Sequence, residues 1–313
     1  MITVKNLTKK YGDFEAVKSI NFQINDGEIL GFLGANGAGK STTLKVMTGY
    51  LSPTKGNVHV NDMNIIDNTI EIQRLIGYLP ELNPLYTDMM VYDLLKFTAS
   101  MREIYGNDFS DALDRVVEQC TLQSVVHKKV SECSKGYKQR IGLASAMIHD
   151  PKILILDEPV SGLDPNQIVE IRHLIKTLGK EKIVIMSSHI LQEIQATVDR
   201  IIIINEGSIV ADGTPDKLVS GAQGNTKLEL EISGAGVKDI RSMATEFDSL
   251  NLLDVKRSGK VVKAIAEYDA KNDLRESIFS YAVNNKWVLL KMNPISEDLE
   301  GIFRELTSSG ANE

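Results

Sequence analysis

The sequence has few of the features that mark secreted, disulfide-stabilised or membrane-spanning proteins. Its 313 residues include two cysteines, Cys120 and Cys133, which cannot make a disulfide framework and fit a reducing compartment such as the cytoplasm. Met1 leads directly into an alternating strand pattern, so we expect no signal peptide. The longest apolar runs, such as residues 153–156 and 201–204, are far shorter than the ~20 residues that a membrane helix needs. If the protein works at a membrane, another chain must span it.

Basic residues are also fewer than acidic residues. The chain has 35 lysine and arginine residues against 42 aspartate and glutamate residues, a net charge of −7 and a pI near 5.4. A nucleic-acid-binding surface would need clustered basic residues, so we expect no nucleic-acid partner. A composition of 42% hydrophobic and 25% charged residues is typical of globular proteins. The length is sufficient for two domains, each with its own core.

A glycine-rich motif lies near the start of the chain. Residues 34–41 read GANGAGKS and match the pattern G-x-x-x-x-G-K-[ST], between an apolar segment that predicts a strand and a segment that predicts a helix. In such a loop, backbone N–H groups and the positive end of the helix bind a nucleotide's phosphates. Lys40 would reach the β and γ oxygens, and the Ser41 hydroxyl would ligate Mg²⁺. We expect the nucleotide to contact Gly34, Asn36, Gly37, Ala38, Gly39, Lys40, Ser41 and Thr42.

A second motif supplies two carboxylates. Residues 153–159 read ILILDEP, an apolar strand that ends in Asp157 and Glu158. The carboxyl ends of strands in open α/β sheets are where ligands bind. Asp157 would hold Mg²⁺ through its water shell, and Glu158 would act as the general base that polarises the attacking water. The alternative, an ordinary strand followed by an acidic turn, is less favoured because the same chain already carries the phosphate loop.

Strand and helix patterns alternate along the first two thirds of the chain and predict an α/β body. Residues 1–33 predict short strands, and the middle of the chain is mainly helical. Asp164 followed by Pro165 predicts a helix start. A linker is expected at residues 220–226. Beyond it the pattern predicts a small α+β domain of ferredoxin-like βαββαβ order, followed by an amphipathic helix over 297–307.

Further motifs resemble those of ABC-transporter ATPases. Residues 133–140, CSKGYKQR, resemble the family's signature, usually L-S-G-G-Q, with direct matches at Ser134 and Gly136 only. Residues 161–164 look like the D-loop, and residues 187–189 look like the segment of the switch histidine. Tyr11 stands where the family stacks an aromatic ring on adenine. Six motifs follow one another in the family's order, so the resemblance does not depend on the signature alone.

The resemblance implies a mechanism in two subunits. Two ATPase domains of this family close head to tail, so that the phosphate loop of one and the signature of the other enclose each ATP. One chain holds one loop and one signature, so a second ATPase subunit is required, and a homodimer is favoured over a heterodimer. By the same resemblance, Ser134 and Gly136 would contact the γ-phosphate in trans, and Asp164 would communicate across the dimer. His189 would hold the γ-phosphate and the attacking water in line with Glu158.

One departure from the family's pattern points to a branch. Glu81 occupies the position where most relatives have glutamine, and an ionised carboxylate can accept but not donate a hydrogen bond. Glu81 could therefore approach Mg²⁺ or water but could not donate to a phosphate oxygen. The sequence Tyr-Leu-Pro-Glu around it resembles the ABC-2 exporter branch. By the same resemblance, residues 81–101 would receive the permease's coupling helix, so the apolar Leu85, Tyr86, Met89 and Met90 are either part of that surface or part of the core.

The combined expectation is an ATP-hydrolysing subunit that powers a membrane exporter through ATP-driven dimerisation. It would sit in the cytoplasm, peripherally on the inner face of the cell membrane, bound to a membrane-spanning permease on a separate chain. Residues 1–220 would form the P-loop ABC-type ATPase domain, with a helical subdomain at about 84–150, and residues 221–313 an accessory or regulatory domain. The alternatives are a soluble ABC-type ATPase acting on ribosomes or DNA, a P-loop GTPase or kinase, and a non-hydrolysing regulatory subunit.

Overall fold

The computed structural model describes the chain except for residues 223–224, 248, 270–271, 296–300, 302 and 304–313. The chain divides into two compact units, residues 1–215 and residues 216–305. Each unit has a hydrophobic core of its own. Cys120 and Cys133 are buried free thiols. No helix in the described ranges is long and apolar enough to cross a bilayer.

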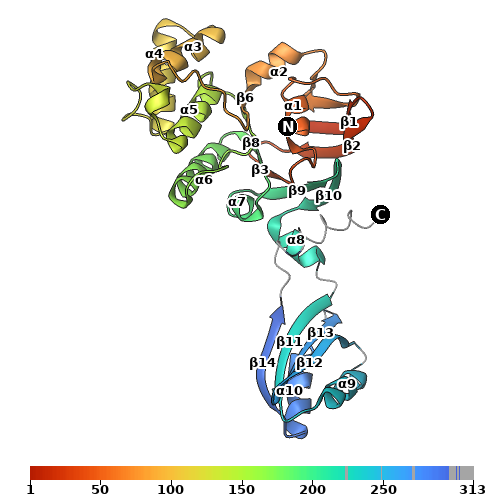
Figure 1. The fold of residues 1–313 in the computed structure, drawn as a ribbon. Helices are drawn as coiled ribbons and strands as arrows, with labels where there is room; N and C mark the ends of the chain where they lie inside the picture. Colours follow the sequence, from red (N-terminus) through yellow and green to blue (C-terminus); the bar gives the residue numbers. More distant parts are fainter. Residues whose placement is uncertain (223–224, 248, 270–271, 296–300, 302, 304–313) are drawn as a thin grey trace. The chain divides into compact units, whose positions relative to one another are not determined.

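A six-stranded sheet forms the centre of the first unit (Figure 1). Its order is β10-β9-β3-β8-β7-β6, and all neighbouring pairs are parallel except β10 with β9. Both faces of β3 and β7 are buried, which explains their uninterrupted apolar sequences. The carboxyl ends of β3, β8 and β7 lie next to one another at one edge. The strands are β3 (Ile29–Leu33), β6 (Ile76–Leu79), β7 (Ile153–Leu156), β8 (Ile183–Ser188), β9 (Arg200–Asn205) and β10 (Ser208–Gly213).

An antiparallel sheet of order β2-β1-β4-β5 completes the strand structure of this unit. It contains β1 (Ile2–Tyr11), β2 (Phe14–Ile24), β4 (Lys55–Val60) and β5 (Met63–Asn64). The sequence predicted several short strands here, whereas β1 and β2 are long and joined by a tight turn. Three register shifts interrupt the pairing of β1 with β2. These shifts break the regular alternation of buried and exposed residues along the two strands.

Seven helices accompany the sheets of the first unit in the described chain, and α3, α4 and α5 pack against one another (Figure 1). The helix start predicted at Asp164 is confirmed, since the Asp164 side chain caps α6, and the side chain of Ser134 caps α5 in the same way. The helices are α1 (Lys40–Met47), α2 (Thr69–Leu75), α3 (Val91–Met101), α4 (Gly106–Gln119), α5 (Lys135–Met147), α6 (Pro165–Gly179) and α7 (Leu191–Gln195), with a 3₁₀ turn η1 (Val130–Glu132).

The predicted linker at residues 220–226 is wrong for most of its length. Helix α8 (Pro215–Ala222) covers its start, and strand β11 (Asn225–Ser233) covers its end. Small residues in the segment resemble a loop, but α8 begins with a proline and has Asp216 in its first turn, two features that stabilise a helix start. The helix then continues into the small residues.

The second unit contains an antiparallel sheet of order β14-β11-β13-β12, and in its described part the helices α9 and α10 accompany the sheet. The chain order β11-α9-β12-β13-α10-β14 is the predicted ferredoxin-like βαββαβ arrangement. Its core includes Leu228, Leu230 and Ile232, alternate residues of the central strand β11. The helix expected over 297–307 lies almost entirely outside the described residues. The further elements are α9 (Val237–Glu246), β12 (Asn251–Ser258), β13 (Val261–Asp269), α10 (Arg275–Asn284) and β14 (Val288–Ile295).

Candidate active site

The loop of residues 34–41 connects the end of β3 to the start of α1. Gly37 and Gly39 have φ angles of 83° and 109°, a region that residues with a Cβ rarely adopt. A Cβ at Gly39 would lie 2.6 Å from the carbonyl oxygen of Ala16, and one at Gly34 would overlap that of Ile204. The loop therefore runs against the backbone of neighbouring strands, and its glycines are required by both conformation and space.

Lys40 lies buried across this loop. Its Nζ donates hydrogen bonds to the carbonyl oxygens of Gly34, at 2.8 Å, and Ala35, at 3.2 Å. The same Nζ lies 3.5 Å from Oε1 of Glu158, and the side chains of this ion pair are 5% and 6% exposed. A buried charge needs such a partner, because the interior stabilises it far less than water does.

The two carboxylates that follow β7 are oriented by Ser187 of β8. The Ser187 hydroxyl donates to Oδ1 of Asp157, at 2.6 Å, and accepts from the backbone N–H of Glu158, at 2.9 Å. Glu158 has a φ of 50°, an uncommon and costly conformation for a residue with a side chain. This role of Ser187 was not predicted from the sequence. The available signal was a serine at the end of an apolar strand just before His189.

His189 directly follows β8 and completes the cluster. Its Nδ1 lies 2.9 Å from Oε2 of Glu158. The turn that carries it is held by Ser188, whose hydroxyl donates to the buried Glu193, at 2.7 Å, and accepts from the N–H of Ile190, at 3.0 Å. The fold therefore brings together three of the predicted residues, with the Glu158 carboxylate between Lys40 and His189.

The residues beside this cluster fit a magnesium ion. Oδ2 of Asp157 is buried and has no hydrogen-bond partner, and the side chain of Ser41 is half-buried at the start of α1. Within the described chain there is no group of three or more acidic, histidine or cysteine side chains that could hold a metal. The Asp157 carboxylate and the Ser41 hydroxyl are the kind of donors expected for Mg²⁺, which usually binds one or two carboxylates, water and the substrate's phosphates.

The predicted signature residues lie at the start of α5. Ser134 is exposed, and its hydroxyl accepts from the backbone N–H of Tyr137, at 3.3 Å. Gly136 is buried, and a Cβ there would lie 2.5 Å from Cδ of Gln167 in α6. Asp164 accepts from the N–H of the same Gln167, at 3.0 Å. Gly136 therefore leaves the space that the Gln167 side chain of α6 occupies, a contact that the sequence alone did not reveal.

The remaining predicted residues are not joined to the cluster. Tyr11 is 48% exposed, with Nζ of Lys9 5.5 Å from its ring centre. Glu81 is exposed in the turn after β6. Among the described residues, no hydrogen bond or ion pair links Tyr11, Glu81 or Ser134 to the cluster. Of the other loop residues, Ala38 is buried, Asn36 and Gly37 are exposed, and Thr42 is half-buried.

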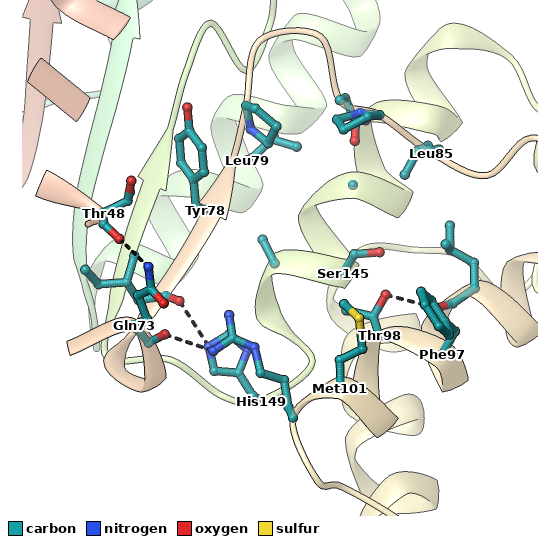
Figure 2. A pocket seen from close by; sticks show the side chains of 18 of the residues that line it. Thr48, Gln73, Tyr78, Leu79, Leu85, Phe97, Thr98, Met101, Ser145 and His149 are labelled. Carbon is teal, nitrogen blue, oxygen red and sulfur yellow. Dashed lines mark hydrogen bonds between the residues drawn. The ribbon is translucent and has the colours of Figure 1, made fainter. Parts of the chain in front are cut away.

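A groove of about 1140 Å³ lies between β6, α2, α3 and α5 (Figure 2); it is called here the α3–α5 groove. Tyr86 is 59% exposed and packs edge-on against Phe97, with ring centres 5.7 Å apart. Of the apolar residues whose position was left open, none is in the core: Leu85 and Met89 are half-buried, and Tyr86 and Met90 are exposed. The apolar wall includes Ile70, Leu85, Tyr86, Leu94, Phe97 and Met101.

Comparison with known proteins shows the family. The family model described as ABC transporter matches residues 17–161. The chain is 35% identical over 312 residues to the bacitracin transport ATP-binding protein BcrA of Bacillus licheniformis, covering 99% of this chain and 98% of that one. It is 37% identical over 219 residues to the probable multidrug ABC transporter ATP-binding protein YbhF of Escherichia coli, covering 70% of this chain and 38% of that one.

Solved structures agree on the fold. The structure of cbiO1 from Clostridium perfringens, part of the ABC transporter complex cbiONQ, has a TM-score of 0.65 and 28% identity, covering 71% of this chain and 91% of that one. The ATP-binding cassette MJ0796, a dimer bound to ADP and Pi, has a TM-score of 0.63 and 24% identity, covering 68% of this chain and 98% of that one. Together with the full-length relative, these matches show that the chain belongs to the ATP-binding proteins of ABC transporters, which are ATPases.

Proposed function

We propose that this chain hydrolyses ATP to power a membrane exporter, and that it does so as a head-to-tail dimer with a second copy of itself. The observation that carries the proposal is the placement of Glu158, whose two carboxylate oxygens face Lys40 and His189. A carboxylate beside the lysine of a phosphate loop is within reach of a γ-phosphate and of the water that attacks it.

ATP binding exchanges the partners of Lys40. Its Nζ donates hydrogen bonds to the carbonyl oxygens of Gly34 and Ala35. The β and γ oxygens of ATP offer full negative charge, so Lys40 turns to them, and the backbone N–H groups of the loop bind the remaining oxygens. Asp157 and Ser41 would hold Mg²⁺, which would supply positive charge beside the phosphates.

Hydrolysis is a displacement at the γ-phosphorus. Glu158 accepts a proton from the attacking water while the water oxygen bonds to the γ-phosphorus. The bond between the γ-phosphorus and the β–γ bridging oxygen breaks, leaving ADP and phosphate. His189 holds the γ-phosphate and the water in line, and its contact with Oε2 of Glu158 orients the base. Ser187 keeps the backbone of Glu158 in position.

The second subunit supplies the other half of each site. Ser134 is exposed at the start of α5, where free N–H groups favour an anion. We assign Ser134 and Gly136 to the γ-phosphate bound by the partner subunit, and Asp164 to the contact between subunits. Because this chain carries both a loop and a signature, two identical copies complete two sites, and a homodimer is favoured over a heterodimer.

Two further residues have weaker structural support and are assigned by resemblance. The exposed ring of Tyr11 is free to stack on adenine. Glu81, exposed beside the sheet edge, can accept a hydrogen bond from water near Mg²⁺. The unit of residues 216–305 carries no motif of this chemistry and is assigned an accessory or regulatory role.

A membrane-spanning permease on a separate chain is the proposed partner, and the α3–α5 groove is its docking surface. Large exposed apolar side chains such as Tyr86 and Met101, at 59% and 65% exposure, mark an interaction site. The protein would then be cytoplasmic and peripheral to the membrane. Export is favoured by relatives named for transport of bacitracin and of multiple drugs. The net charge of −7 disfavours a nucleic-acid partner.

Glu158→Gln tests the assignment of the base. Glutamine keeps the size of the side chain but cannot take the proton, so the variant should bind ATP and stay closed. We expect an ATP-dependent dimer on size-exclusion chromatography and a turnover rate lower by about a hundredfold or more. Glu118→Gln, the same exchange at an exposed position on α4, serves as the matched control and should keep most of the turnover. An unchanged turnover rate in Glu158→Gln would show that another group is the base.

A further inference from the structure

The turn between β8 and α7 places His189 with little help from packing. The side chain of His189 is 38% exposed, and Ile190 after it is 41% exposed. A reactive side chain keeps its working position only when neighbouring groups fix it. Because packing does not hold the imidazole, its position depends on the hydrogen bonds of the turn.

Ser188 connects this turn to two other parts of the unit. Its hydroxyl accepts a hydrogen bond from the N–H of Ile190, at 3.0 Å, and donates one to Oε2 of Glu193 in α7, at 2.7 Å. Its carbonyl oxygen accepts from the N–H of Gly34 in the phosphate loop, at 3.3 Å. The backbone that carries His189 is therefore tied to the phosphate loop on one side and to α7 on the other.

Glu193 is a buried carboxylate that the proposed mechanism does not yet use. It is 7% exposed, and no basic side chain in the described part of the chain forms an ion pair with it. Removing a carboxylate from water costs free energy that one hydrogen bond returns only in part. Proteins tolerate such a cost chiefly where function requires it. The bond to Ser188 thus explains this glutamate better than a contribution to stability does.

Helix α7 holds Glu193 at a fixed place. A helix of five residues is not stable by itself, so its position comes from contacts with other elements. Gly31 of β3 leaves the space that the Ile194 side chain occupies, since a Cβ there would overlap it. From α6, Nη2 of Arg172 donates to the carbonyl oxygen of Gln192, at 2.5 Å. Anchored in this way, α7 offers Ser188 an acceptor that does not move.

We infer that Glu193 is a positioning residue for ATP hydrolysis. Through the Ser188 hydroxyl it holds the turn in which Nδ1 of His189 lies 2.9 Å from Oε2 of Glu158. Glu193 itself does not touch the nucleotide or the attacking water. This inference rests on the proposed function, because it requires His189 to act in hydrolysis.

The kinetic test exchanges Glu193 in the full chain. Glu193→Ala should lower kcat by about tenfold or more and leave KM for ATP within about threefold, because the turn relaxes while the phosphate loop stays intact. Glu193→Gln keeps an acceptor oxygen at the same reach and should retain most of the rate. Glu193→Asp keeps the charge but falls short of Ser188, so it should resemble Glu193→Ala.

The matched control lies on the same helix. Gln195 is exposed on α7, so Gln195→Ala removes a side chain of similar size and should keep the wild-type rate. A rate retained by Glu193→Asp and lost in Glu193→Gln would show that the charge matters and not the bond to Ser188. That result would overturn the inference.

A double-variant test distinguishes positioning from a general structural role. In a chain that carries His189→Ala, adding Glu193→Ala should lower the remaining rate by less than about twofold, because the residue through which Glu193 acts is already gone. A further tenfold loss in that background would mean that Glu193 only supports the fold.

Nuclear magnetic resonance gives a readout that does not depend on activity. In protein labelled with ¹⁵N-histidine, the ring signals of His189 are assigned by their absence in His189→Ala. Glu193→Ala and Ser188→Ala should both shift these signals, and Gln195→Ala should not. Ser188→Ala breaks the same link by removing one oxygen atom, so its kcat and its spectrum decide the question if Glu193→Ala does not fold.

The outcomes separate this inference from the function on which it rests. If His189→Ala leaves the turnover rate unchanged, the proposed role of His189 in hydrolysis is wrong. If His189→Ala lowers the rate but Glu193→Ala and Ser188→Ala leave both the rate and the His189 signals unchanged, the proposed function stands and the positioning role of Glu193 is wrong.

Discussion

At the scale of the residue, most of the chemistry depends on how a few buried polar side chains are paired. Asp157 and Glu158 are neighbours in sequence, yet Ser187 gives them different environments by binding the carboxylate of one and the backbone of the other. One oxygen of Asp157 stays unpaired and available to a cation, whereas both oxygens of Glu158 already face cationic or polar partners. Adjacent carboxylates can thus take separate roles.

His149 makes the stability of the protein depend on pH. Burial is the main cause of its lowered pKa, about 4 against 6.5, with Arg102 as a second cause. The folded protein therefore prefers the neutral imidazole. The contribution of the neutral His149 imidazole to the free energy of unfolding is fully present above pH 6.5. It is lost as pH falls towards 4, because the unfolded chain binds the proton first.

We expect wild type to lose about 2 kcal/mol more than His149→Gln in unfolding free energy between pH 7 and pH 4, allowing for screening by solvent. Urea denaturation at several pH values measures this difference. Glutamine does not titrate and can still donate to Ile76. His173→Gln, at an exposed position on α6, controls for the loss of a histidine. Parallel pH curves for wild type and His149→Gln would contradict the prediction.

At the scale of the element, helix α5 links the proposed docking groove to the proposed signature. Its first turn is capped by Ser134, and its middle lies against the loop that follows β6. Nδ2 of Asn83 in that loop donates to the carbonyl oxygen of Lys138, at 2.8 Å. Gly142 leaves the space that the Asn83 side chain occupies. A displacement of the groove's loop would therefore be transmitted directly to α5.

Ser134 has two roles on this helix, and two substitutions separate them. Ser134→Ala removes the cap, at a cost of about 1 kcal/mol, whereas Ser134→Asn preserves a capping oxygen. If the hydroxyl also contacts the partner's γ-phosphate, both variants should lose the ATP-dependent dimer of Glu158→Gln on size exclusion. Thermal unfolding should show that Ser134→Asn keeps wild-type stability. Normal dimerisation of Ser134→Asn would mean that Ser134 acts only as a cap.

At the scale of the whole molecule, the chain consists of two units with separate cores. The proposed nucleotide site lies entirely within residues 1–215, as does the α3–α5 groove. Two cores of this kind can unfold independently, and a ligand stabilises only the unit that binds it.

Differential scanning calorimetry should accordingly resolve two unfolding transitions. With Glu158→Gln, Mg²⁺ and ATP should raise one transition by about 5 °C or more and leave the other unchanged. Adding Lys40→Met to this variant should abolish the shift, because the loop loses its cation for the phosphates. A single transition that moves as a whole would show that the two units unfold as one.

The sequence by itself determined the local motifs. The loop of residues 34–41, the strand ending in Asp157 and Glu158, and the cap at Asp164 are contiguous, so their patterns predict their structures. The βαββαβ order of the second unit was equally predictable, because each element has its own periodicity. The linker was not, since α8 continues through residues whose local preference is for a loop.

Only the tertiary structure decided which residues meet. Lys40, Glu158 and His189 are far apart in sequence and converge because β3, β7 and β8 are parallel neighbours whose carboxyl ends share one edge. The role of Ser187, the packing of Gly136 on α6 and the exposure of Tyr86 depend on contacts between elements distant in sequence. The periodicity of apolar residues predicts that a residue can be buried. Which residue it then contacts depends on how the sheets and helices pack.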